Sequence, residues 1–78
     1  MEINNQVVEI LKDNLGVDVI SYDDHLIEDL DADSLDIVEL VVKIEKEFDI
    51  SIRDDEIDDN FTTVGHLIDF IQEKYETL

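Results

Sequence analysis

The sequence lacks several residue types that would point to particular kinds of protein. It contains no cysteine, no proline and no tryptophan, and only two glycines among 78 residues. Without cysteine there is no disulfide framework and no thiolate metal site. Met1 is followed by neither a basic segment nor a long apolar run, so we expect no secretion signal and no membrane span. These absences favour a cytoplasmic protein, in which any thiol chemistry would need an imported thiol.

Positive charge is also scarce, because five Lys and Arg residues stand against 23 Asp and Glu residues, for a formal net charge of −18. Nucleic acids and anionic membranes bind basic surfaces, so the composition argues against both and favours basic protein surfaces as partners. Hydrophobic residues make up 44% of the chain and recur at helical spacing, which favours a folded core over disorder. The length predicts one domain over residues 1–78, which we expect to be a monomer.

Apolar periodicity predicts an all-α fold, a small four-helix bundle with three main helices and one short helix. Residues 3–15 form the first helix, which ends at Gly16, and residues 34–48 form the most regular one. Residues 49–52 read as an extended connector, and residues 54–59 as the short acidic helix. Thr62 or Thr63 caps the last helix, whose expected apolar face is Val64, Leu67, Ile68, Ile71 and Tyr75.

A long loop, residues 17–33, is expected between the first two main helices, because this acidic stretch has no sustained apolar period. A loop of this length in a compact domain is more often functional than accidental. We expect one helical turn within it and apolar residues that anchor it to the core. The expected anchors are Val19, Ile20, Tyr22, Leu26, Ile27 and Leu30.

The helix over residues 34–48 carries two apolar faces. One face should join the core through Ile37, Leu40, Val41, Ile44 and Phe48. Leu35, Val38 and Val42 fall nearly opposite, beside Asp36 and Glu39. They either pack against the long loop or form an exposed apolar stripe edged with carboxylates, which would mark a partner surface. Of the three, Leu35 is the one we expect to be partly buried.

Ser34 stands at the start of this helix, within Asp33-Ser34-Leu35-Asp36. A serine in this position is ordinarily an N-cap, but Asp33 can take that role, with Asp36 completing an approximate capping box. Ser34 would then be the first exposed helical residue. Flanked by acids, it has no base to activate it as a nucleophile, so it is better suited to being modified by another enzyme. A phosphodiester there would lie at the positive end of the helix dipole.

The spacing Asp29-x-Asp31-x-Asp33 matches the first three ligands of an EF-hand, but the rest of that motif fails. Ser34 stands where the loop needs glycine, and Leu40 where it needs the bidentate glutamate. We therefore expect no specific metal site, only weak binding of divalent ions.

An enzyme would need a base beside its nucleophile, and His25 and His66 are the only imidazoles in the chain. Neither lies in a catalytic motif, and His66 is expected on the surface of the last helix. We therefore expect no catalytic residue in this chain.

Nearly the whole chain resembles the acyl carrier protein family. The resemblance rests on Leu26-Ile27-Glu28-Asp29-Leu30, Asp33-Ser34-Leu35-Asp36, Val38-Glu39-Leu40-Val41 and Phe61-Thr62-Thr63-Val64. It implies a four-helix bundle in which a transferase attaches 4′-phosphopantetheine from coenzyme A to Ser34, and in which acyl groups are carried as thioesters on that arm. The acyl chain is usually sheltered between helices in this family, and the matching positions are Leu26, Ile44, Ile52 and Phe61.

The resemblance also implies which partners bind. These are phosphopantetheinyl transferase, acyltransferases, ketoacyl synthases and reductases with basic docking patches. The expected docking face consists of Asp33, Leu35, Asp36, Val38, Glu39 and Val42. Fatty-acid synthesis is the most similar branch, and polyketide, D-alanine and lipid A-type carriers are the alternatives. Two alternative functions are not those of a carrier: an unmodified acidic adaptor that binds basic proteins and, more distantly, a calcium-responsive module.

The chain departs from the family pattern at several positions. Asp31 stands where glycine is usual and Arg53 where proline is common, while Lys43 and Lys46 add positive charge to a helix that is generally more acidic. One residue is also extra in the segment before Phe61. These departures bear on the short helix and on partner choice, and they leave the attachment motif intact.

Overall fold

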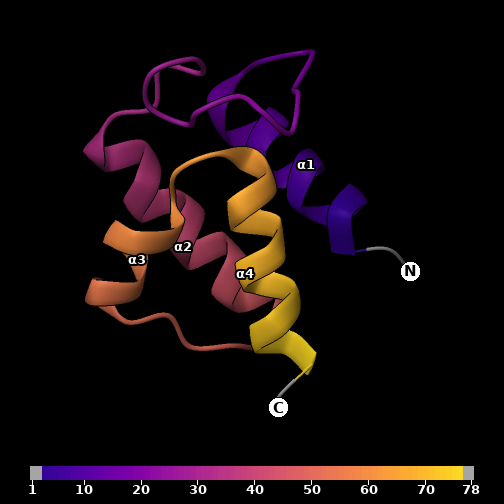
Figure 1. Ribbon diagram of the computed structural model, residues 1–78, viewed down its shortest axis with the longest axis vertical. Helices are drawn as coiled ribbons and strands as arrows, with labels where there is room; N and C mark the ends of the chain where they lie inside the picture. Colours follow the sequence, from indigo (N-terminus) through magenta and orange to yellow (C-terminus); the bar gives the residue numbers. More distant parts are fainter. Residues whose placement is uncertain (1–2, 77–78) are drawn as a thin grey trace.

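The computed structural model describes residues 3–76, which form four helices (Figure 1). These are α1 (Ile3–Leu15), α2 (Ser34–Phe48), α3 (Asp54–Asn60) and α4 (Val64–Glu76). The only β-pairing within these residues is an isolated bridge between His25 and Thr63. The predicted all-α bundle is therefore confirmed, with a short helix one residue longer than expected. None of the helices within residues 3–76 is long and apolar enough to cross a membrane.

Local signals in the sequence explain where the helices begin and end. Gly16 has a positive φ of 67°, and its N–H donates to the Lys12 carbonyl at 2.9 Å, so α1 ends in the left-handed cap that glycine favours. Asp49 ends α2 with a φ of 55°. Of the two candidate caps for α4, Thr63 is the one used, because its hydroxyl accepts the His66 N–H at 3.2 Å.

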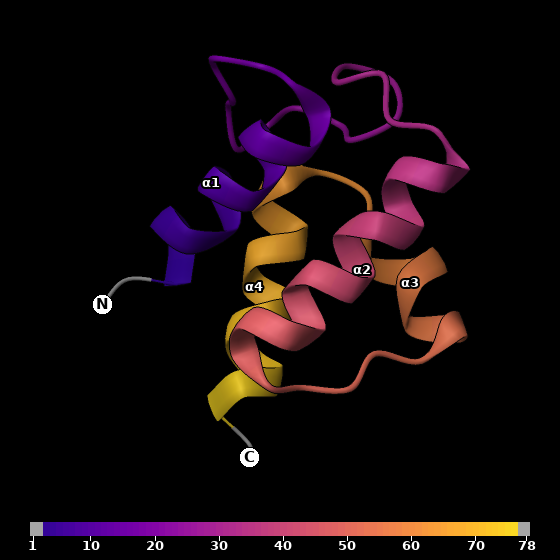
Figure 2. The same ribbon diagram turned by 180° about the vertical axis from the view of Figure 1, so that it is seen from behind.

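One core joins the three long helices and the loop. Its buried side chains are Val7, Leu11, Leu26, Ala32, Leu40, Val41, Ile44, Phe48, Ile50, Phe61, Val64, Leu67, Ile68 and Ile71. Two predicted core residues lie nearer the surface: Ile37 is half-buried, and Tyr75 is exposed while its ring meets Phe48 edge-to-face at 6.0 Å. α3 contributes no buried residue, and both views place it on the far side of α2 from α1 (Figures 1 and 2).

The loop over residues 17–33 covers one end of the bundle (Figure 2). Val19, Tyr22 and Ile27 are exposed, Val19 at 82%, so the prediction that these three anchor it is wrong. Among the other expected anchors, Leu26 is buried and Ile20 and Leu30 are half-buried. Besides these apolar contacts, backbone hydrogen bonds fix the loop to the residues at the start of α4. Three such bonds, each 2.9 Å long, join Leu26 to Thr62, Val64 to Asp24 and Gly65 to Tyr22.

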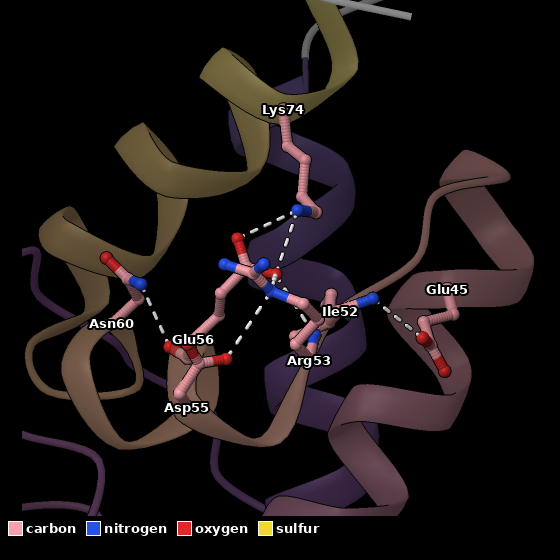
Figure 3. A network of polar contacts seen from close by, with 7 residues as sticks. All are labelled: Glu45, Ile52, Arg53, Asp55, Glu56, Asn60 and Lys74. Carbon is pink, nitrogen blue, oxygen red and sulfur yellow. Dashed lines mark hydrogen bonds and ion pairs between the residues drawn. The ribbon is translucent and has the colours of Figure 1, made fainter.

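α3 has no buried residue, and polar contacts attach it to the rest of the molecule (Figure 3). Lys74 Nζ on α4 donates to both carboxylate oxygens of Glu56, at 2.8 and 2.9 Å. The backbone N–H of Arg53 donates to Glu56 Oε1 at 3.0 Å, and the N–H of Ile52 donates to Glu45 Oε2 at 2.8 Å. Arg53 thus supplies an N–H that the family's usual proline lacks. The hydrogen bonds from Lys74 lower the pKa of Glu56, helped by the Arg53 N–H.

Thermal stability is expected to rise with salt. No Lys or Arg lies between Asp13 and Val42, while acids crowd that stretch, so screening should relieve their repulsion. Melts followed by circular dichroism at low ionic strength and at about 0.15 M, where the Debye length is about 8 Å, test this expectation. Millimolar magnesium should act in the same direction. An unchanged or lower melting temperature at the higher salt concentration would contradict the repulsion argument.

The substitution Glu56→Gln is expected to lower the free energy of unfolding at pH 7 but not at acidic pH. Because the folded-state pKa of Glu56 is lowered from its ordinary value of 4.5, the contribution of the Lys74 pair is present above that value and is lost as pH falls through the lower folded-state pKa. Urea unfolding of both proteins at neutral and acidic pH measures the difference. Glu76→Gln removes the same charge from an exposed site as a control. An equal effect of both substitutions at pH 7 would show that the pair adds nothing.

Candidate functional site

The start of α2 is closed by a capping box of two aspartates. The Asp36 N–H donates to Asp33 Oδ1 at 2.9 Å, and the Asp33 N–H donates to Asp36 Oδ2 at 3.1 Å. The predicted capping role of Asp33 is thereby confirmed. Ser34, the first residue of α2, is exposed, and its side chain has no hydrogen-bond partner within residues 3–76. Its hydroxyl is therefore available for modification.

An open hollow of about 670 Å³ adjoins Ser34, between the loop, α2 and α3. Its lining is mainly apolar and consists of Ile27, Ala32, Asp33, Ser34, Ile37, Val38, Ile57, Asp58 and Phe61. The sequence analysis did not single out Ile57 for this role. The signal was present, since Ile57 is the one apolar residue in the acidic segment 54–60.

The expected apolar stripe on α2 is exposed. Leu35, Val38 and Val42 are accessible at 72%, 59% and 45%, so of the two alternatives the exposed surface is the one observed. The prediction that Leu35 is partly buried is wrong, because it is the most exposed of the three. The loop that would have covered it is bonded to the start of α4 instead. Beside the stripe, Glu39 is exposed and Asp36 is half-buried.

The four residues expected to line an acyl chain lie at different depths. Phe61 is buried and borders the hollow. Leu26 and Ile44 are completely buried in the core, and Ile52 is half-buried, and none of these three lines the hollow in this conformation. The hollow therefore reaches only the outer edge of the expected lining.

Asp31 adopts a positive φ of 63° just before the attachment motif. Glycine adopts this left-handed conformation readily, and aspartate is among the few other residues that tolerate it. Within residues 3–76 no group of three or more acidic or histidine side chains is arranged to hold a metal ion.

The two histidines have structural partners. His66 Nε2 lies 3.1 Å from Asn60 Oδ1, and His25 Nδ1 accepts the N–H groups of Ile27 and Glu28 at 3.2 and 3.4 Å. Neither is hydrogen-bonded to Ser34. Within residues 3–76, therefore, neither imidazole is placed to act as a base on the serine.

Fold and site together define a small four-helix domain with an exposed serine at the start of its longest helix. The family model described as a phosphopantetheine attachment site matches residues 5–71. An acyl carrier protein of Picosynechococcus sp. (strain ATCC 27264 / PCC 7002 / PR-6) is 48% identical over 75 residues, covering 94% of this chain and 91% of that protein. A solved structure described as an acyl carrier protein from Mycobacterium tuberculosis has a TM-score of 0.85 at 27% identity, covering 92% of this chain and 97% of that one.

The chain therefore belongs to the acyl carrier protein family, whose members bind phosphopantetheine. Its four-helix fold is the fold of that family. Family members act as carriers for biosynthetic enzymes.

Proposed function

We propose that this chain carries acyl groups as thioesters on a 4′-phosphopantetheine arm attached to Ser34, and that it serves fatty-acid synthesis in the cytoplasm. In this proposal residues 1–78 form one monomeric acyl carrier domain. The observation that carries it is the exposed Ser34 hydroxyl, which has no hydrogen-bond partner among the described residues 3–76 and lies beside an apolar hollow. When attached, the group supplies the thiol that a chain without cysteine lacks.

The start of α2 suits a phosphodiester on Ser34. Exposure of the side chain gives a transferase access, and the helix dipole favours an anion at this end. Asp33 and Asp36 oppose the anion with their charge, but both carboxylates are engaged by backbone N–H groups. The transferase must itself remove the hydroxyl proton, because neither histidine is hydrogen-bonded to Ser34.

The hollow offers shelter to the start of an acyl chain. Ile27, Ile37, Val38, Ile57 and Phe61 present apolar surface next to Ser34. Each methylene group moved from water into such surroundings contributes about 0.8 kcal/mol. Leu26, Ile44 and Ile52, which the family pattern assigns to the lining, lie beyond the hollow and would be reached by a chain that penetrates further.

Docking is proposed on the exposed side of α2. Leu35, Val38 and Val42 supply apolar contact, and Asp36 and Glu39 lie beside them. Basic patches on phosphopantetheinyl transferase, acyltransferases, ketoacyl synthases and reductases complement this charge. Asp33 completes the proposed surface. A carrier for polyketide, D-alanine or lipid A-type synthesis would use the same site, whereas an unmodified acidic adaptor would not need Ser34.

Ser34→Ala is expected to abolish attachment of phosphopantetheine while the protein stays folded. The intact mass of protein incubated with coenzyme A and an active transferase measures this directly. Wild type should gain one phosphopantetheine, as should Ser51→Ala, which removes another exposed serine. Because Asp33 is the cap, the change in unfolding free energy for Ser34→Ala should be at most about 1 kcal/mol. A full mass gain in Ser34→Ala would overturn the assignment.

Glu39→Lys is expected to slow association with a basic transferase and to weaken its salt dependence, because the charge beside the stripe is reversed. Glu76→Lys, an equal reversal at the end of α4, should have little effect. Transfer kinetics over a range of salt concentrations give the comparison, and circular dichroism confirms folding. Indistinguishable kinetics for the two variants would place the docking face elsewhere.

Val42→Ala is expected to speed dissociation from the same enzyme, by an amount equivalent to about 1 kcal/mol if the side chain is buried in the complex. Val42 is 45% exposed in the free protein, so truncation should cost the isolated fold little. Surface plasmon resonance separates the association and dissociation rates. A change confined to the association rate would show that Val42 makes no lasting contact.

A further inference from the structure

His25 caps a single helical turn that precedes the attachment motif. The N–H groups of Asp29 and Leu30 donate to the His25 carbonyl at 2.9 and 3.0 Å, which closes the turn. The amides of Ile27 and Glu28, two and three residues after His25, donate to His25 Nδ1 at 3.2 and 3.4 Å. This is the geometry of an N-cap, with an imidazole nitrogen in place of the usual side-chain oxygen.

An imidazole nitrogen can accept these hydrogen bonds only while it carries a lone pair. The neutral ring has one donor and one acceptor nitrogen, so Nδ1 is the unprotonated nitrogen here, whereas in the imidazolium both nitrogens are donors. Histidine is the side chain whose charge ordinarily changes between about pH 5 and 8. Protonation of His25 must therefore remove the cap from both amides at once.

We propose that His25 is a proton-sensitive cap: in its neutral form it orders the turn over residues 25–30, and protonation releases that turn. The turn adjoins the site on two sides. Ile27 lines the hollow beside Ser34, and the Ala32 N–H donates to the Leu26 carbonyl at 2.9 Å immediately before the attachment motif. Leu26 is itself held in the core, so release acts mainly on the exposed Ile27 wall of the hollow.

Several charged or titratable groups lie near His25 on its own segment and at the start of α4. On its own segment these are Asp24, Glu28 and Asp29, and Asp29 Oδ2 already accepts the His25 backbone N–H at 2.7 Å. At the start of α4, the bridge partner of His25 is Thr63, which does not titrate. His66, the titratable residue near that end, pairs with Asn60 instead. An imidazolium at position 25 therefore loses both amide partners.

Amide hydrogen exchange of the unmodified protein tests the proposal without relying on Ser34 chemistry. Protection factors for Ile27 and Glu28, measured by solvent-exchange NMR, should fall between pH 7.5 and pH 5.5 by roughly fivefold, the change in opening equilibrium expected for loss of a typical N-cap. The ring nitrogen shifts should show Nδ1 as the unprotonated nitrogen at the higher pH. Failure of phosphopantetheine attachment would leave this result unaffected.

Two variants separate the cap from general effects of acidity. His25→Ser keeps a side-chain acceptor that does not titrate, so its protection should not change with pH, and His25→Asn serves the same purpose if the serine variant is unfolded. His66→Gln removes the other histidine and should behave as wild type. Equal pH dependence in His25→Ser and wild type, or no change in wild type, would overturn the proposal.

Discussion

The scarcity of positive charge is the constraint on which the arrangement of this molecule depends. Five basic residues must serve a chain with 23 acids. Lys12, Lys46 and Lys74 lie in the last turns of α1, α2 and α4, where a cation meets the negative end of the helix dipole. Lys74 also binds Glu56, while Arg53 lies beside that carboxylate at the start of α3. Most of the basic residues thus stabilise helix ends, and the stretch that includes Ser34 contains none.

That distribution leaves the attachment end of the molecule acidic, and the local structure accommodates it through backbone N–H groups. The carboxylates of Asp33 and Asp36 each accept a hydrogen bond from the backbone N–H of the other residue. The Asp29 carboxylate accepts one from the His25 N–H. These carboxylates are thus partly compensated without any cation. The capping box has a second effect. The Asp33 carboxylate accepts the hydrogen bond that a capping serine would otherwise accept, so the Ser34 hydroxyl is not needed as a cap. The same interaction that begins α2 therefore makes the serine available.

The sequence predicted those features that depend on neighbouring residues. The bounds of α1 and α2, the left-handed Gly16 and the Asp33–Asp36 box all follow from contacts within a few positions of each other. Exposure of Leu35 could not be predicted in this way. It depends on the path of the loop, which is decided by hydrogen bonds to residues of the α4 entry more than thirty positions further along the chain.

The same distinction between local and distant contacts applies to the hollow. Its walls combine Phe61 from the core with Ile27 and Ile57, which are exposed and half-buried respectively. Ile57 belongs to a helix held by polar contacts, and Ile27 to a turn held by a histidine cap. Leu26 and Ile44, by contrast, are completely buried.

An acyl chain that reached Leu26 or Ile44 would therefore have to displace α3 or the turn over residues 25–30, since the core itself is close-packed and yields at higher cost. Under the proposals above, the depth that such a chain reaches would depend on the polar contacts around Glu56 and on the cap at His25. The contacts of Glu56 with Lys74 weaken as Glu56 gains a proton. An imidazole nitrogen accepts the two amides of the turn only while it is unprotonated. In the proposed function, the apolar packing would determine where a chain lies, and these polar contacts would determine how readily α3 and the turn move to admit it.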